Sequence, residues 1–178
     1  LTRDQDATAD IGYVYNSNFQ LPLSGNSFDW RLRPQTGVSM ELTTPAVIAG
    51  EDQNSPPAQN LTIRFLDTPA QFNNIEQFLR LAPGNYEFAI HYSARDLKTP
   101  KPLQFAMRCV GTNQLLGSLS FEEGTIKTRT DSVPVQIPTR DCALQHISVS
   151  NAQMPMSWRN RYSGTLELNQ VSLSRVEN

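Results

Sequence analysis

Seven aromatic or hydrogen-bonding side chains could form a binding surface. An aromatic ring stacks against the C–H face of a sugar, and the planar groups of Arg, Gln and His bond to sugar hydroxyls. Phe78 is the aromatic residue that departs from the apolar face of its expected strand, and Trp158 lies in a polar, basic stretch, residues 157–162. The candidate carbohydrate-binding residues are Trp158, Phe78, Arg64, His91, Gln104, Arg108 and Trp30.

The aromatic candidates each have a structural alternative. The Phe78 ring could lie under a loop, since single exposed apolar side chains are ordinary. Trp158 could cap one end of the domain instead of lining the rim of a site. Trp30 is expected to pack under the loop that follows it, because large aromatic residues near strand starts often plug the ends of a sandwich. Sequence alone does not tell whether the outward residues share one sheet.

The acidic residues and motifs of the chain do not indicate catalysis. Glycoside hydrolysis needs two carboxylates about 5 to 9 Å apart, but Glu122 and Glu123 are adjacent and would point to opposite faces of a strand. Residues 116–120 come nearest to a serine-nucleophile motif and lack its second glycine. His91 and His146 have no partner at metal-ligand spacing, and there is no phosphate loop or dinucleotide motif. We therefore expect a protein that is not an enzyme and has no cofactor and no metal.

Length and charge exclude several classes of partner. The 178 residues fit one domain. The net charge is −2 and no block of basic residues occurs, so the sequence does not indicate binding to nucleic acid. No apolar run approaches the roughly 20 residues needed to span a bilayer, so no membrane insertion is expected. We expect residues 1–12 to be a tail or linker from a longer protein and residues 13–178 to form the domain.

Short segments with apolar residues at alternate positions predict β-strands. The cleanest alternation runs from Tyr86 to Ser93. Other expected strands cover residues 61–65, 75–81, 103–109, 115–121, 133–137, 147–149 and 166–173, with weaker candidates at 13–20, 28–32 and 38–42. One apolar and one polar face per strand suits two packed antiparallel sheets. The expected fold is an all-β, two-sheet antiparallel β-sandwich with jelly-roll topology.

Three local features refine this expectation. Turns at residues 82–85 and 111–113 predict hairpins over residues 75–93 and 103–121. Pro134 cannot donate to a sheet ladder, so its strand is expected at an edge or a bulge. The apolar phase changes after Leu168, which predicts a β-bulge around residues 169–170.

The two cysteines, Cys109 and Cys142, allow either one disulfide or two buried thiols. Their spacing matches no zinc or redox motif. We predict a disulfide, which would imply an oxidising compartment and hence a periplasmic or secreted protein.

Several ordered segments resemble the galactose-binding-like jelly-roll modules with which many bacterial proteins hold carbohydrate. Residues 16–20 are similar to the opening strand of that family, and residues 72–77 with 81–86 are similar to its central hairpin. Residues 166–173 are similar to its closing strand. The resemblance implies a non-catalytic module that binds a polysaccharide or oligosaccharide.

A narrower resemblance concerns the segments around the cysteines. Residues 103–109 and 142–145 are similar to a module that follows helical repeats in bacterial envelope and polysaccharide-related proteins. This resemblance implies an alternative function as a protein–protein interaction module in an envelope or exopolysaccharide-export assembly. The partner would then be another envelope protein.

The wider family often holds a structural calcium through carboxylates of its first and last strands. Calcium takes six to eight hard oxygen ligands, charged ones among them. Here the corresponding segments carry the neutral amides of Asn18, Gln20, Asn169 and Gln170. We therefore expect no calcium site.

Overall fold

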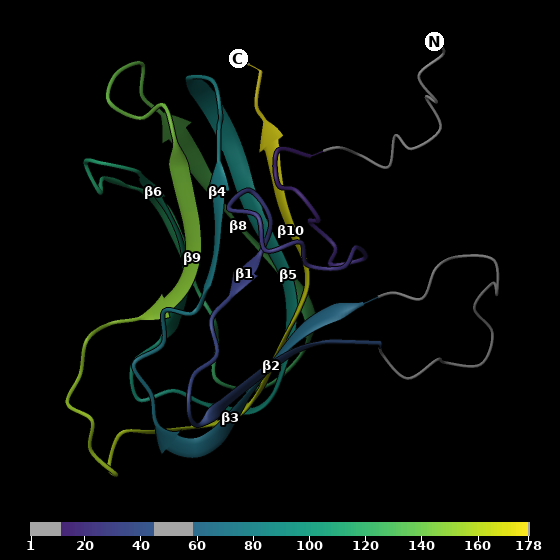
Figure 1. Ribbon diagram of the computed structural model, residues 1–178, viewed down its shortest axis with the longest axis vertical. Coiled ribbons are helices and arrows are strands. Elements are labelled where there is room, and N and C mark those ends of the chain that lie inside the picture. The colour runs from purple at the N-terminus through teal and green to yellow at the C-terminus, as the bar shows by residue number, and fades with distance from the viewer. Residues whose placement is uncertain (1–11, 45–58, 178) are drawn as a thin grey trace, which may run out of the picture.

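The computed structural model describes residues 12–44 and 59–177 of the chain. The regular elements of these residues are strands, arranged in two antiparallel sheets of five that form two layers (Figure 1). The expected all-β, two-sheet jelly-roll sandwich is confirmed. Within the described ranges, no helix is long and apolar enough to cross a bilayer.

The two sheets are named A and B here. Sheet A has the strand order β1–β4–β9–β6–β7, and sheet B has the order β2–β3–β10–β5–β8. The strands of sheet A are β1 (Arg31–Leu32), β4 (Ile75–Leu79), β6 (Leu103–Cys109), β7 (Leu115–Ser120) and β9 (Gln145–Asn151). The strands of sheet B are β2 (Val38–Thr43), β3 (Asn60–Pro69), β5 (Gly84–Lys98), β8 (Gly124–Ile137) and β10 (Arg161–Arg175).

The apolar faces of both sheets meet in one core. Aromatic rings join the two layers: Phe88 of β5 lies edge-on to Phe105 of β6 at 5.2 Å, and Phe105 in turn contacts Trp30 at 6.1 Å. These rings are fully or almost fully buried. Because alternate residues of a strand point to opposite faces, the side chains between them are directed outward. The residues that pack in the core therefore fix which of their neighbours along each strand lie on the outer surface.

Three local predictions are confirmed. β6 and β7 form an antiparallel hairpin, as expected for residues 103–121. Pro134 lies on β8, an edge strand of sheet B, the kind of strand on which proline is tolerated. The β5–β10 register shifts between Leu168 and Gln170, where the apolar phase changes.

The hairpin predicted over residues 75–93 is wrong. β4 lies in sheet A and β5 lies in sheet B, so the turn between them carries the chain from one layer to the other. Tyr86 fixes this crossing by donating its hydroxyl proton to the carbonyl of Ala82 at 2.8 Å. Alternation shows that each strand has one apolar face directed to the core. Two strands joined by a turn can meet this condition either as a hairpin within one sheet or as members of opposite sheets.

The weak strand predicted at residues 13–20 forms turns instead. Asn16 and Phe19 have positive φ angles of 49° and 59°, which interrupt an extended chain. The Phe19 N–H donates to the Asn16 carbonyl at 3.1 Å. Because the Phe19 ring is fully buried, it anchors this turn on the core.

Candidate functional site

The structure places five of the candidate residues on two opposite surfaces. Phe78, Gln104 and Arg108 lie on the outer face of sheet A, between residues whose side chains enter the core. Arg64 and His91 lie on the outer face of sheet B in the same way. The outer faces of a two-layer sandwich point away from each other, so one site cannot use both sets.

A hollow of about 270 Å³ lies on the outer face of sheet A. Phe78 on β4 pairs with His146 on β9, and the centroids of their rings are 4.9 Å apart. His146 pairs in turn with Arg108 on β6. The three side chains form a row across neighbouring strands, which are about 4.8 Å apart. This row brings an aromatic ring, an imidazole and a guanidinium to one surface.

Glu76 lies on the same face as this row and carries its own set of partners. One of its carboxylate oxygens is 2.8 Å from His146 Nε2 and 3.4 Å from Arg33 Nη2. Its other oxygen is 3.6 Å from Arg31 Nη1. Arg33 also donates to the carbonyl of Asn73 at 2.8 Å. Since charge-assisted bonds of this kind hold their partners in place, Glu76 fixes the imidazole and both guanidiniums as an ordered array.

A second hollow of about 250 Å³ lies beside the row and is lined by two further aromatic residues. Tyr15 and Phe28 are 51% and 48% exposed. The Phe78 N–H donates to the carbonyl of Ser27 at 2.9 Å, which holds the loop before β1 against β4. The buried carboxylate of Asp29 accepts hydrogen bonds from two backbone N–H groups at 2.7 Å and stabilises this loop.

Two buried amides position the segments around the hollows. Gln77, which points into the core from β4, accepts a hydrogen bond from the Tyr15 N–H at 3.1 Å and donates to the Tyr15 carbonyl at 3.0 Å. Gln145, at the start of β9, accepts from the Leu81 N–H at 2.8 Å and donates to the carbonyl of Cys142. Both amides are fully buried, so their bonds are protected from water.

The predicted disulfide between Cys109 and Cys142 is confirmed. Cys109 follows Arg108 directly at the end of β6, and Cys142 lies in the loop before β9, which carries His146. The disulfide therefore ties together the two segments that carry Arg108 and His146, two of the three side chains of the row. The described part of the chain contains no free cysteine.

The outer face of sheet B lacks such a row among its described residues. The His91 Nδ1 atom is 2.6 Å from Thr130 Oγ1, and the Arg64 side chain is exposed. A hollow of about 200 Å³ on this face is lined by residues 93–95, Thr165 and Glu167, none of which is aromatic. These residues offer hydrogen bonds but no ring on which a sugar could stack.

The two tryptophans lie away from the row. Trp158 is 71% exposed in the β9–β10 loop, which leaves β9 at the end opposite to the hollow and extends beyond the lower end of the sandwich in Figure 1. Trp30 is 1% exposed, and its indole N–H donates to the Asn16 carbonyl at 3.0 Å. The Trp30 ring therefore has no surface on which to meet a ligand.

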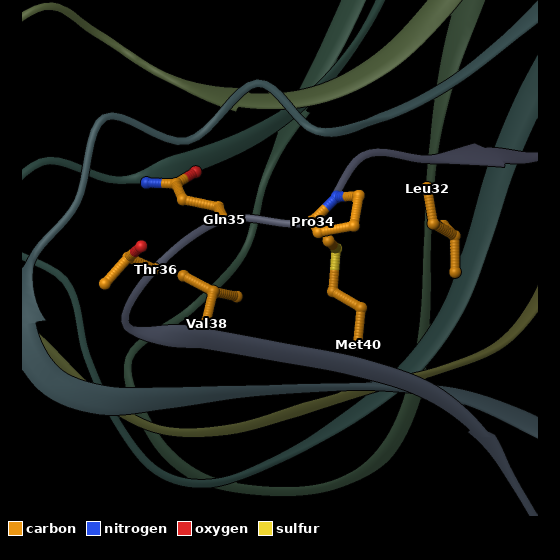
Figure 2. A pocket seen from close by; sticks show the side chains of 6 residues that line it. All are labelled: Leu32, Pro34, Gln35, Thr36, Val38 and Met40. Atoms are coloured by element: carbon orange, nitrogen blue, oxygen red, sulfur yellow. The ribbon is translucent and has the colours of Figure 1, made fainter.

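Another hollow, of about 530 Å³, lies between β1 and β2, which are edge strands of the two sheets (Figure 2). Its lining residues are Leu32, Pro34, Gln35, Thr36, Val38 and Met40. None of them is charged or aromatic, so this hollow offers neither a stacking ring nor charge-assisted bonds. The outer face of sheet A has both.

Amide side chains at the positions considered for calcium ligands make hydrogen bonds within the chain. The Asn169 side chain donates to the Asn60 side chain at 2.8 Å, and the backbone N–H of Gln20 donates to the Asn18 side chain at 3.4 Å. The Asn60 amide in turn donates to the Glu167 carboxylate at 3.5 Å. In residues 12–44 and 59–177, no three His, Cys, Asp or Glu side chains cluster as metal ligands would.

Sequence reasoning missed four residues of this surface, Arg31, Arg33, Glu76 and His146. It also missed Tyr15 and Phe28, the aromatic residues of the second hollow. Glu76 carries a usable signal, because it lies two residues before Phe78 and therefore shares its strand face. His146 and Arg31 reach this face through strand pairings that alternation cannot reveal. Tyr15 and Phe28 lie in loops, where no periodicity exists.

No family model matches the chain, and no curated protein matches its sequence. Solved structures that it resembles include a CBM4 module, with a TM-score of 0.57, 14% identity and coverage of 92% of this chain and 99% of that one. Another is a putative sugar binding protein from Bacteroides thetaiotaomicron VPI-5482, with a TM-score of 0.59, 8% identity and coverage of 93% and 100%. The CBM22-1 xylan-binding domain of Paenibacillus barcinonensis Xyn10C gives a TM-score of 0.56, 11% identity and coverage of 91% and 93%. The chain thus has a jelly-roll fold like that of carbohydrate-binding modules.

Proposed function

We propose that this protein is a non-catalytic carbohydrate-binding module whose binding surface is the outer face of sheet A. The observation that carries the proposal is the row of Phe78, His146 and Arg108 in one hollow. A ring to stack on and planar groups that bond to hydroxyls are what a sugar site requires. The xylan-binding domain that shares the fold supports the same class of ligand.

A glycan chain could lie across this face and contact several strands. Phe78 is half-buried, so its ring keeps a fixed orientation while one side stays accessible. Phe28 and Tyr15 line the second hollow, at the loop that bonds to the Phe78 backbone, and add two exposed rings there. Gln104 is exposed on β6, the strand of Arg108, and adds an amide further along the same face. The outer face of sheet A therefore offers an extended surface rather than a closed cavity.

The proposal assigns no catalysis to this surface. Glu76 is the single acidic residue in the described strands of sheet A, and it is bound by His146, Arg31 and Arg33. Glycoside hydrolysis uses two carboxylates with separate roles. We further propose that the protein is periplasmic or secreted, which the disulfide supports because such bonds persist in oxidising compartments.

A glycan-array screen followed by titration calorimetry tests this function. Phe78→Ala should weaken binding of the selected glycan about tenfold or more, because buried aromatic anchors dominate binding energy. The matched control is Leu66→Ala, which removes an exposed apolar side chain from sheet B. Both variants should melt as cooperatively as the wild type. Equal binding by Phe78→Ala and the wild type, or no glycan bound at all, would contradict the proposal.

A second candidate function is docking to another envelope protein. The observation in its favour is the β9–β10 loop, where Met156 and Trp158 are 62% and 71% exposed. Aromatic residues and Met are enriched where proteins meet. If this function holds, Trp158→Ala should abolish association with the partner, while Phe78→Ala should leave that association unchanged.

A further inference from the structure

The outer face of sheet A carries an excess of positive charge, although the whole chain has a net charge of −2. Its cations are Arg31 on β1, Arg33 just beyond that strand and Arg108 on β6. The single acidic residue in the described strands of sheet A, Glu76, is 7% exposed, whereas the side chains of Arg31 and Arg33 are 40% and 48% exposed. A ligand that approaches this face therefore meets guanidiniums before it meets a carboxylate.

Arg108 is the cation best placed for a ligand. It lines the hollow that Phe78 and His146 also line. One of its terminal nitrogens donates to the Asn113 carbonyl at 3.0 Å, which orients the guanidinium. Across the described residues, no carboxylate lies within ion-pair distance of Arg108. A guanidinium has five N–H donors in a planar fork, so most of its donors are left for a ligand.

Neighbouring acidic groups do not cancel this charge. Glu76 is shared by two arginines and His146, so one carboxylate faces two permanent cations. Asp29 lines the adjacent hollow, but it is 1% exposed and accepts hydrogen bonds from backbone N–H groups. The guanidinium fork matches the two oxygens of a carboxylate, and such bidentate bonds are stronger than those to neutral hydroxyls. A neutral sugar can accept hydrogen bonds from a guanidinium through its hydroxyls, but it cannot form the charge-assisted bidentate pair.

We infer that the ligand of this face is an acidic polysaccharide, in which Arg108 binds the carboxylate of a uronic acid residue while Phe78 stacks on a sugar ring. This inference rests on the proposed function, because it names the ligand class of the same surface. Arg31 and Arg33, ordered by Glu76, would attract further carboxylates along the chain.

The test compares acidic polymers with their own neutral forms. The probes are polygalacturonate and alginate, each in its native form and after chemical reduction of its carboxyl groups, titrated calorimetrically. We expect at least one native polymer to bind and its reduced form to bind about ten- to a hundredfold more weakly, the range for losing a charge-assisted hydrogen bond. Raising the salt concentration should weaken binding of the native polymer, because salt screens exposed charges.

Two variants connect the effect to one side chain. Arg108→Gln should weaken binding of the native polymer by the same ten- to hundredfold and should weaken binding of the reduced form clearly less, so the difference in affinity between the two forms should narrow. The matched control, Arg95→Gln, removes the same charge from an exposed position on sheet B and should change binding less than twofold. Dextran sulfate should bind more weakly than the uronate polymer, since it lacks planar carboxylates.

The outcomes separate the inference from the function on which it rests. A neutral glycan that binds through Phe78 as well as any uronate polymer would overturn the inference and keep the proposed function. Equal losses in Arg108→Gln and Arg95→Gln, or stronger binding of dextran sulfate, would overturn the inference by showing unspecific attraction of polyanions. Failure of every glycan to bind would overturn both.

Discussion

The outer faces of the two sheets use charge in different ways. On sheet B, opposite charges pair in the open: Asp67 and Arg161 lie 3.3 Å apart, and their side chains are 62% and 49% exposed. On sheet A, Glu76 is almost buried and serves three partners at once. Exposed pairs add little stability and satisfy each other. On sheet A the guanidiniums have more N–H donors than Glu76 can accept. The remaining donors can bond to an acceptor on a ligand.

This difference shows that the two faces of one sandwich can specialise independently. Folding depends on the inner faces, where the aromatic core of Phe88, Phe105 and Trp30 joins the layers. The side chains of the outer faces do not pack in the core, so they are accessible to a ligand. On sheet A, Phe78, His146 and Arg108 line one hollow, whereas the hollow on sheet B is lined by no aromatic residue and by neither His91 nor Arg64.

The largest expected effect comes from removing the disulfide beside the row. Replacing Cys109 and Cys142 together by Ala should lower the free energy of unfolding by about 3 to 4 kcal/mol, given their separation of 33 residues. Urea denaturation measures this loss. Glycan binding should fall as well, because the bond ties the segments of Arg108 and His146 together. A double variant with unchanged affinity would show that the row does not depend on this bond.

Substituting Glu76 compares the two charge arrangements directly. Glu76→Gln leaves two arginines and His146 without their shared carboxylate and should cost about 1 to 3 kcal/mol of stability. The matched variant on sheet B, Asp67→Asn, breaks an exposed pair and should cost less than about 1 kcal/mol. Chemical denaturation of both variants gives the comparison. Equal costs would mean that Glu76 does not organise its face.

A smaller effect is expected from Tyr92, which lies inside sheet B. Its hydroxyl donates to Asp131 Oδ2 at 3.2 Å and accepts from the Glu122 N–H at 3.3 Å. Tyr92→Phe should lower stability by about 1 kcal/mol, the usual value of one hydrogen bond. Because Tyr92 belongs to sheet B, glycan binding should stay unchanged, and a clear loss of affinity would contradict the separation of the two faces.

The same residue predicts how stability depends on pH. Burial raises the pKa of Tyr92 above its ordinary value near 10. A raised pKa in the folded state means that the stabilising contribution is complete below pH 10 and is lost as the pH rises through the folded pKa. The melting temperature of the wild type should therefore fall above pH 10, and Tyr92→Phe should fall less steeply. Parallel curves for the two proteins would argue against this role.

The fold was largely predictable from the sequence, whereas the site was predictable only in part. Alternation identified most strands and their inward residues, and the phase change after Leu168 located the bulge. Neither alternation nor a turn says which sheet a strand joins, so the hairpin predicted over β4 and β5 was wrong. For the same reason the sequence left open whether Arg64 and His91 share a sheet with Phe78. The loop residues Tyr15 and Phe28 are positioned by tertiary hydrogen bonds, which have no local sequence signal.

Mapping of amide chemical shifts during titration with a bound glycan tests the central claim most directly. The claim is that one face alone binds ligand. We expect the amide signals of Phe78, Arg108 and His146 to move as the glycan is added, while those of Arg64 and His91 stay in place. Shifts that cluster around Arg64 and His91, or in the loop of Trp158, would contradict this account.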